Sequence, residues 1–247
     1  MPMRRPRVYL PRPLTRGALV ALDATAARHV TQVLRLKAGA DLILFDGTGG
    51  EWHAVLERSD RDAVLARVGT HWARAAESPL AVVLAQGVSR GERMDYTLQK
   101  AVELGVTRIV PLFTERSVVN LKGERLERRQ QHWQAVAASA CEQCGRDHVP
   151  TVDAPRALTE WLADGDAAGL KLVLDPDAAQ SLPRGVAPPP DEITLLIGAE
   201  GGLSGIEMDL ARRAGFIPCR LGPRILRTET AAVAALAALQ TLWGDFS

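Results

Sequence analysis

From Pro79 onward strands and helices alternate along the chain, and this alternation limits the fold more than any other feature of the sequence. Short apolar runs of strand type are separated by segments whose apolar residues recur at helical spacing. The predicted strands cover residues 79–88, 107–113, 170–175, 193–198 and 217–222, and the predicted helices cover residues 89–105, 122–145, 157–165, 204–214 and 228–243. Parallel strands joined by helices form a sheet that helices cover on both faces. The sequence therefore predicts an α/β domain with a mainly parallel sheet over residues 80–247.

Two of the predicted helices begin with the pattern of a capping box, in which a Ser and a Glu three residues later satisfy the first backbone N–H groups. Ser89 with Glu92 and Ser204 with Glu207 fit this pattern. The earlier of the two helices also places several apolar residues on a single face, at Met94, Leu98, Ala101 and Val102.

The amino-terminal part of the chain follows a different pattern and is mostly of β type. Short alternating runs indicate strands, and Asp46–Gly50 has the composition of a hairpin turn. One helix is expected at residues 24–35, with Asp23 as its N-cap. This pattern predicts a small β-barrel with one inserted helix over residues 1–72, and the polar segment 73–79 is expected to link it to the α/β domain.

Composition limits the environment in which such a chain works. No segment reaches the roughly 18 consecutive apolar residues of a membrane helix, and no signal-peptide pattern follows the basic amino terminus. The three cysteines are too few for a closed disulfide framework. Since free cysteines are typical of a reducing environment, we expect a cytoplasmic protein with no membrane partner.

Four glycines follow a predicted strand in the stretch Thr194–Gly205. Their spacing fits neither the G-x-G-x-x-G dinucleotide motif nor the P-loop, because no Lys-Ser or Lys-Thr pair follows. Ligands of open α/β sheets bind at the carboxyl ends of strands, where this loop lies. Glycine lets the backbone approach a ligand closely, and Glu200 has no compensating charge in the loop. We therefore favour a binding loop over a plain tight turn.

A second candidate segment, Leu221–Ala232, also follows a predicted strand. It places Arg224 and Arg227 beside Glu229 and two threonines, immediately before a helix that is apolar almost all round. Such a helix is buried, either within its own domain or against another subunit. Charged groups at its start are then partly desolvated, as in active sites, although ordinary charged flanks of a helix would give the same pattern.

The two segments together closely resemble the 16S rRNA (uracil-N(3))-methyltransferases, a family of the knotted SPOUT class. The resemblance is carried by GAEGG at 198–202 and by LGPRILRTETAA at 221–232. Further similar stretches extend it over essentially the whole chain: RVYLPRPL at 7–14, SRGERMDYTLQKAVELGVTRIVPLFTERS at 89–117 and ACEQCGR at 140–146. One departure is Ala199, where the family commonly has proline, and this change removes no polar group.

The resemblance implies a PUA-like β-barrel, then a SPOUT-type α/β domain with a C-terminal trefoil knot, and a homodimer with the cofactor S-adenosylmethionine at the subunit interface. It further implies methyl transfer to nitrogen-3 of a uridine in 16S ribosomal RNA, either free or in the assembled small subunit. Two alternatives remain, namely a ribose 2′-hydroxyl acceptor and a non-catalytic RNA-binding factor of ribosome assembly. For the latter we would expect bulky residues in the glycine loop or loss of the charged cluster before the last helix, and the sequence has neither.

The adenine of this cofactor needs an apolar slot and backbone hydrogen bonds, which glycine turns next to apolar residues supply. The residues expected to bind it are Ile197, Gly198, Gly201, Gly202, Leu221, Gly222, Ile225, Leu226, Thr228 and Thr230, and the resemblance implies Leu174 as part of a third wall. Nitrogen-3 of uracil carries a proton, so the transfer needs a proton acceptor and a cation near the uracil anion. We expect Glu200 or Glu229 to take the proton, and Arg227 to stabilise the anion or a neighbouring phosphate.

Basic residues are concentrated at the amino terminus, although the net charge of the chain is only +1. Between Met1 and Lys37 there are eight Lys or Arg residues and one acidic residue. This distribution indicates a local surface for a polyanion, although a merely solvated basic terminus would have the same composition. The residues expected to contact RNA phosphates are Arg4, Arg5, Arg7, Arg12, Arg16, Arg28, Arg35 and Lys37, with Arg90 and Arg93 extending them towards the site.

The spacing of Cys141, Cys144 and His148 resembles part of a zinc or redox motif. Both cysteines fall within a predicted helix, however, and a structural zinc site needs four ligands, which a second metal-binding pair would have to complete. We therefore expect no metal, and we expect these residues to pack at the helix end or to face RNA. The remaining histidines are expected to be structural or on the surface: His29, His53, His71 and His132.

Overall fold

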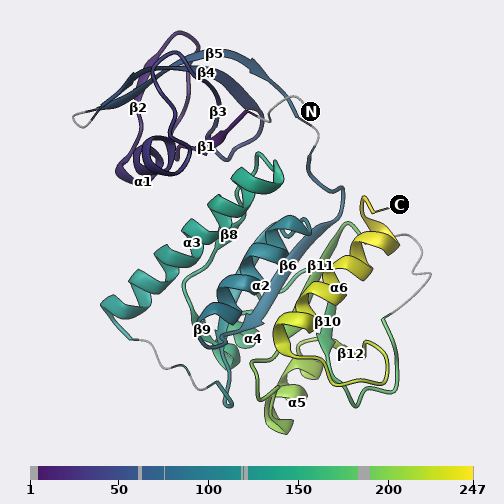
Figure 1. The fold of residues 1–247 in the computed structure, drawn as a ribbon. Helices are drawn as coiled ribbons and strands as arrows, with labels where there is room; N and C mark the ends of the chain where they lie inside the picture. Colours follow the sequence, from purple (N-terminus) through teal and green to yellow (C-terminus); the bar gives the residue numbers. More distant parts are fainter. Residues whose placement is uncertain are drawn as a thin grey trace. The chain divides into compact units, whose positions relative to one another are not determined.

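The computed structural model describes residues 5–60, 63–74, 76–117, 119, 122–182 and 190–246, and the chain forms two compact units (Figure 1). Unit 1 comprises Met1–Glu77 together with Ala138–Val149. Unit 2 comprises Ser78–Ala137 together with Pro150–Ser247.

Unit 1 is built on a five-stranded sheet in the order β1-β3-β4-β5-β2. Its strands are β1 (Arg7–Tyr9), β2 (Leu19–Ala21), β3 (Asp41–Phe45), β4 (Glu51–Ser59) and β5 (Val64–Trp72). β1 pairs with β3 in parallel, and the other pairs are antiparallel. Apolar residues at alternating positions of these strands face one core, among them Leu42, Leu44, Ala54, Leu56, Ala66 and Val68. The predicted turn Asp46–Gly50 connects β3 to β4, as expected.

The inserted helix of unit 1 begins where the sequence predicts. The side chain of Asp23 accepts hydrogen bonds from the backbone N–H groups of Thr25 and Ala26, which caps α1 (Ala24–Arg28). The helix then continues as the π-helical turn η1 (His29–Val33).

Residues 138–149, which the sequence analysis assigns to the α/β domain, pack as part of unit 1. They form the last turns of α3 (Glu124–Cys144) and the loop that follows it. In this loop Asp147 accepts a hydrogen bond from the backbone N–H of Gly50 at 2.6 Å. Arg146 pairs with Glu77 at 2.5 Å and accepts a bond from Arg7 at its carbonyl oxygen. These polar contacts join the loop to the β-sheet of unit 1.

Unit 2 contains a parallel sheet in the order β12-β10-β11-β6-β7-β8, with β9 also pairing with β7. Its strands are β6 (Ala81–Gly87), β7 (Arg108–Phe113), β8 (Thr151–Val152), β9 (Arg156–Ala157), β10 (Leu170–Leu174), β11 (Glu192–Ile197) and β12 (Ile217–Cys219). Every pairing among them is parallel, which confirms the predicted sheet. Their carboxyl ends therefore lie at one edge.

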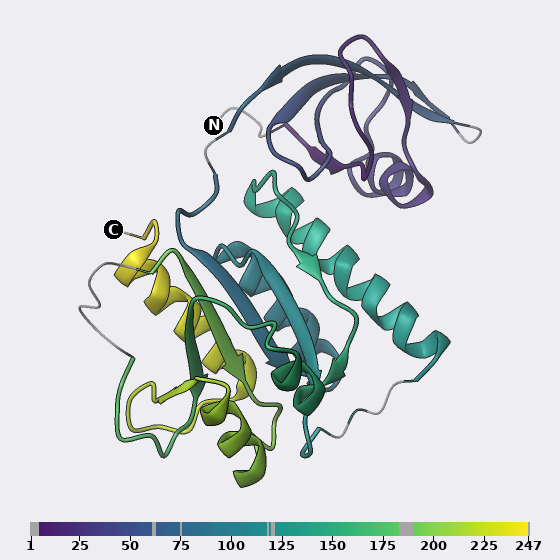
Figure 2. The ribbon, with the colours of Figure 1, turned by 180° about the vertical axis from the view of Figure 1, so that it is seen from behind.

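Helices cover both faces of this sheet. Figure 1 shows α2 (Glu92–Glu103) and α6 (Thr228–Trp243) side by side in front of the sheet. From behind, α4 (Leu158–Asp164) and α5 (Gly205–Arg213) lie on the opposite face (Figure 2). On that face Trp161 and Ala211 pack with strand residues in one buried core. The predicted apolar face of α2 is buried, as expected.

One of the two predicted capping boxes is present and the other is wrong. Ser204 and Glu207 form both reciprocal hydrogen bonds at the start of α5. At α2 the N-cap is instead Gly91, whose φ of 55° turns the chain into the helix two residues later than predicted. Glu92 is thus the first helical residue and not the third, so it cannot complete a box with Ser89.

A small β unit joined to a parallel α/β unit agrees with the predicted fold class. The trefoil knot that the family resemblance implies stays a prediction. Over the described ranges, none of the helices has the length and apolar character needed to cross a membrane.

Candidate functional site

A cavity of about 320 Å³ opens at the carboxyl edge of β10, β11 and β12 in unit 2. Because these strands are parallel, the segments that follow them converge on it. Its lining comes mainly from residues 174–177 at the end of β10, residues 197–203 at the end of β11, and residues 219–222 and 224–226 at the end of β12. Thr228 and Ala231 from the start of α6, Met208 of α5 and Arg116 complete it. The glycine loop and the second candidate segment thus share one cavity.

The glycine loop is folded tightly against its neighbours. The backbone N–H of Gly202 donates to the carbonyl of Ala199 at 2.9 Å, with Gly202 at a φ of +69°. A Cβ atom on Gly198 would lie 2.7 Å from the carbonyl carbon of Gly202. A Cβ atom on Gly87, at the end of β6, would collide with the backbone of Ala199. Side chains at these positions would force the backbones apart, which explains the glycines.

Glu200 fastens this loop to the start of α2. Its Oε1 accepts a hydrogen bond from the backbone N–H of Arg90 at 2.9 Å and lies 3.3 Å from Nη1 of Arg93. The side chain is 23% exposed. Glu200 therefore compensates its charge with Arg93, a partner that lies 107 residues away in the chain.

A loop after β7 forms a further wall that the sequence analysis missed. Arg116 donates from Nη1 to the carbonyl oxygen of Gly201 at 2.9 Å, and a Cβ atom on Gly201 would lie 2.8 Å from the Cβ of Arg116. The backbone N–H of Glu115 donates to buried Glu207, which also completes the capping box of α5. Two loops distant in sequence are thus held together. No local pattern around Arg116 would have revealed this.

The segment after β10 places acidic groups beside an apolar wall. Asp175 accepts a hydrogen bond from the backbone N–H of Asp177 at 3.0 Å, and its own N–H donates to the carbonyl of Cys219. Burial, with a smaller contribution from the charge of Asp175, raises the pKa of the Cys219 thiol to about 12. Since only the thiolate is a strong nucleophile, Cys219 serves as a neutral wall residue near pH 7.

The predicted cofactor-binding residues lie together almost without exception. All of them line the cavity except Thr230, which is exposed on the first turn of α6. The residues that line it without having been predicted as cofactor ligands are Arg116, Asp175, Pro176, Asp177, Ala199, Leu203, Met208, Cys219, Arg220, Arg224 and Ala231, together with Glu200, which was predicted to be catalytic. Asp175 and Arg220 directly follow strand ends, a position that could have identified them.

The three predicted catalytic residues are placed differently from one another. Glu200 lines the cavity, whereas Arg227 and Glu229 do not. Arg227 is the exposed N-cap of α6. Glu229 follows it in the first turn, with its Oε2 atom buried and without a hydrogen-bond partner among the described residues. The two acidic groups therefore differ in their surroundings. Glu200 in the glycine loop accepts a hydrogen bond, whereas Oε2 of Glu229 at the start of α6 has no such partner among the described residues.

Most of the basic residues predicted to contact RNA are exposed, but Arg7 is a correction. It is only 5% exposed and forms an ion pair with buried Glu51, so it is unavailable to a phosphate. Arg4 lies outside the described residues. The exposed members in unit 1 are Arg5, Arg12, Arg16, Arg28, Arg35 and Lys37. In unit 2, Arg90 and Arg93 are exposed beside Glu200.

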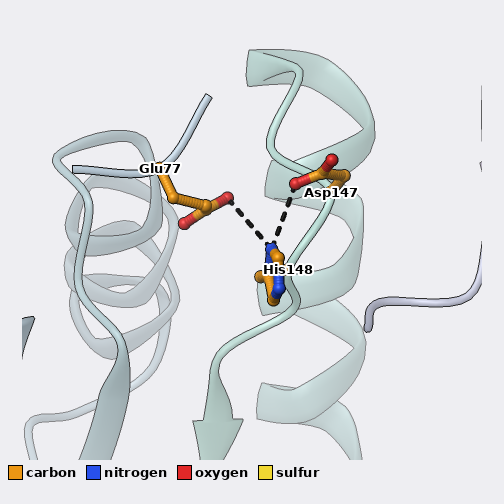
Figure 3. A group of neighbouring side chains, drawn as sticks. All are labelled: Glu77, Asp147 and His148. Atoms are coloured by element: carbon orange, nitrogen blue, oxygen red, sulfur yellow. Dashed lines mark hydrogen bonds and ion pairs between the residues drawn. The ribbon is translucent and has the colours of Figure 1, made fainter. Parts of the chain in front are cut away.

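The cysteine motif forms packing contacts at the end of α3. Burial raises the pKa of Cys141 to about 12, and its thiol donates to the carbonyl oxygen of His148. The His148 ring instead faces two carboxylates, with Nδ1 lying 3.1 Å from Asp147 and 4.0 Å from Glu77 (Figure 3). Both carboxylates have other partners, since Glu77 pairs with Arg146 and Asp147 accepts from the backbone of Gly50. Glu77, Asp147 and His148 therefore form packing contacts within unit 1.

Comparison with known proteins identifies the chain's relatives. The RNA methyltransferase domain family matches residues 76–240, and the RNA methyltransferase PUA domain family matches residues 22–69. Ribosomal RNA small subunit methyltransferase E from Buchnera aphidicola subsp. Schizaphis graminum is 34% identical over 100% of both chains. The protein of the same name from Mycobacterium bovis is 32% identical over 92% of this chain and 87% of its own.

Solved structures agree with these relatives. Ribosomal RNA small subunit methyltransferase E from Neisseria gonorrhoeae, bound to S-adenosyl methionine, has a TM-score of 0.90 and 41% identity, over 99% of this chain and 100% of its own. A Legionella pneumophila protein in complex with the cofactor SAM has a TM-score of 0.93 and 40% identity, with the same coverage.

Proposed function

The chain belongs to the ribosomal RNA small subunit methyltransferase E family, and from this premise we propose that it transfers a methyl group from S-adenosylmethionine to nitrogen-3 of a uridine in 16S ribosomal RNA. The observation that carries the proposal is the cavity shared by the glycine loop and residues 221–228.

The chemistry of the cavity lining suits this cofactor. When bound, S-adenosylmethionine supplies an electrophilic methyl group on a sulfonium. The lining offers an apolar surface for an adenine, from Leu174, Ile197, Leu203, Leu221, Ile225 and Leu226. It also carries both signs of charge, which a ligand with a carboxylate, an ammonium and a sulfonium requires. The acidic groups are Asp175, Asp177 and Glu200, and the basic groups are Arg116, Arg220 and Arg224.

We assign the proton of uracil nitrogen-3 to one of two carboxylates, Glu200 or Glu229. Oε1 of Glu200 already accepts from Arg90 and Arg93, whereas Oε2 of Glu229 has no partner within the described part of the chain. This difference favours Glu229 as the proton acceptor and Glu200 as a residue that holds the loop. The exposed guanidinium of Arg227 stabilises the uracil anion or an adjacent phosphate.

Exposed arginines on both units support phosphate contacts with the RNA. The arginines of unit 1 bind the RNA backbone without reading the RNA sequence. Arg90 and Arg93 bind the RNA backbone close to the cavity. A single-stranded or unpaired uridine is the expected target, because nitrogen-3 is covered in a base pair. The RNA is either free or part of the assembled small subunit, and the protein works in the cytoplasm.

A homodimer is part of the proposal. The outward side of α6 is poor in charge, with Ala234, Ala237 and Ala238 half-buried and Leu242 exposed. Tyr96, on neighbouring α2, is 47% exposed. A second copy of the chain would bury this apolar surface. Analytical ultracentrifugation tests it, since a monomer at micromolar concentration would contradict the dimer.

Calorimetric titration with S-adenosylmethionine tests the cofactor assignment. We expect one site per chain, with affinity reduced by Gly198→Val, because a Cβ atom there would lie 2.7 Å from the carbonyl carbon of Gly202 and push the loop apart. Absence of binding by the wild-type protein would contradict the proposal and favour an RNA-binding role without catalysis.

A further inference from the structure

A fully buried glutamine, Gln86, lies directly beneath the glycine loop. It belongs to β6 and pairs in register with Ile197, the last residue of β11. Gln86 is 0% exposed, and the buried residues that precede it in β6, from Val82 to Ala85, are apolar. Its Nε2 donates to Oγ1 of Thr228 at 2.9 Å and to the carbonyl of Gly87 at 3.0 Å. The carbonyl of Gly198 lies 3.5 Å away.

Thr228 continues this hydrogen-bond chain to the loop. It is the first residue of α6 and is buried, and its hydroxyl donates to the carbonyl oxygen of Gly198 at 2.7 Å. Both Thr228 and Gly198 line the cavity, whereas Gln86 does not. The hydrogen bonds from Gln86 to Thr228 and from Thr228 to Gly198 therefore connect the start of α6 to the glycine loop.

These bonds fix the orientation of one peptide group of the loop. The carbonyl of Gly198 and the N–H of Ala199 belong to the same planar unit, so a bond that holds one sets the direction of the other. Ala199 lines the cavity. The same chain of bonds holds the start of α6, on which Thr228, Glu229 and the N-cap Arg227 lie.

Packing alone does not account for a glutamine at this position. A buried amide costs free energy unless all its polar atoms are paired, and an apolar residue in the middle of a parallel sheet avoids that cost. Oε1 of Gln86 has no hydrogen-bond partner among the described residues. The amide is retained at a cost in stability, which points to a role in the geometry of the site.

We propose that Gln86 is a positioning residue for the cofactor site, which through Thr228 holds the Gly198–Ala199 peptide and the start of α6 in their binding arrangement. This inference rests on the proposed function, because the site must be a cofactor site. Gln86 itself touches no ligand and takes no part in the transfer.

The chain offers a matched control, because a second glutamine tethers the other end of α6. Gln240 is also fully buried, accepts a bond from Ser78 at 2.7 Å and donates to the carbonyl of Leu104 at 3.0 Å. It lies outside the cavity lining. Gln86→Met therefore removes an amide hydrogen bond to α6 at the cavity. Gln240→Met removes amide hydrogen bonds from α6 away from the cavity.

The test measures S-adenosylmethionine affinity by calorimetry, well below the melting temperature of each variant, together with the melting temperature without ligand. We expect Gln86→Met to weaken binding roughly tenfold, the loss of about one buried hydrogen bond. Gln240→Met is expected to lower the melting temperature but to keep the affinity within about twofold. Thr228→Val is expected to weaken binding, and Thr228→Ser, which keeps the hydroxyl, to recover most of the loss.

A double-mutant cycle separates positioning from general destabilisation. If the two side chains act through one bond, Gln86→Met combined with Thr228→Val loses less affinity than the sum of the single losses. Affinity within twofold of wild type in Gln86→Met overturns the proposal. If Gln86→Met does not fold, unchanged affinity in Thr228→Val overturns it in the same way. Failure of the wild-type protein to bind the cofactor contradicts the proposed function instead.

Discussion

The carboxylate of Glu200 accepts a hydrogen bond from the backbone N–H of Arg90 at 2.9 Å, which ties the glycine loop to the segment that leads into α2. Glu200 thus has a structural task in addition to any chemical one. A glutamine at position 200 keeps an oxygen that accepts from Arg90, whereas an alanine at this position has none.

We therefore expect Glu200→Ala to weaken S-adenosylmethionine binding by about tenfold, because the loop loses one charge-assisted hydrogen bond. Glu200→Gln is expected to stay within about threefold of wild type, because its amide oxygen still accepts from Arg90. Calorimetry on both variants measures the difference. Equal affinities in the two variants would show that the bond does not hold the loop.

Glu229 is expected to matter for the rate of transfer and not for cofactor binding. Loss of a general base costs typically ~10² to 10⁴-fold in rate, so Glu229→Gln should lower kcat within that range at nearly unchanged cofactor affinity. Single-turnover methyl transfer to 16S RNA measures the rate, and Glu200→Gln serves as the matched carboxylate control. A near-normal rate for Glu229→Gln, together with a large loss for Glu200→Gln, would reverse the assignment.

Two glycines of the same stretch should respond differently to alanine. A Cβ atom at Gly201 would lie 2.8 Å from the Cβ of Arg116, whereas one at Gly205 would have no atom within 4 Å. Overpacking of this kind costs typically about 1–3 kcal/mol, so Gly201→Ala should lower cofactor affinity or stability, with the loop and the Arg116 segment pushed apart. Gly205→Ala should bind the cofactor like wild type. Equal behaviour of the two variants in calorimetry and thermal unfolding would contradict the close contact between Gly201 and Arg116.

Cys219 should resist alkylation near neutral pH, although it lines the cavity. With a pKa of about 12, only about one thiol in 10⁴ is ionised at pH 8, and the fraction rises tenfold with each pH unit. Iodoacetamide should therefore modify Cys219 about three orders of magnitude more slowly in the folded protein than in the unfolded chain. Peptide mass spectrometry after timed labelling measures the rates. Labelling at the unfolded rate would show that the thiol is neither buried nor close to the Asp175 charge.

The arrangement of unit 2 could be predicted because parallel strands bring their carboxyl ends to one edge. That rule places the glycine loop and residues 221–228 together from the sequence alone. It does not extend to Arg116, which reaches Gly201 from a loop 85 residues away and has no pattern of its own. Gln86 was equally hidden, because its partner Thr228 is set by the sheet order and not by sequence spacing.

Two of the predictions failed because a residue pattern shows neither a distant partner nor a backbone angle. Charge composition assigned Arg7 to the RNA surface because it cannot reveal a buried partner such as Glu51. Ser89 fitted the capping pattern, but the positive φ of Gly91 delays the start of the helix, and a residue pattern carries no backbone angle. Patterns of residue type thus predicted most of the helices and strands, and they failed where a single long-range partner or a single dihedral angle decides the outcome.

The proposed activity of the protein is methyl transfer to nitrogen-3 of a uridine in 16S ribosomal RNA. The most direct test incubates the protein and S-adenosylmethionine with small subunits, and separately with free 16S RNA, taken from a strain lacking the gene. Nucleosides are then identified by mass spectrometry. The proposed activity predicts one new 3-methyluridine per RNA, absent when Arg227→Ala protein is used. A ribose-methylated nucleoside, or no methylated nucleoside from either substrate, would contradict it.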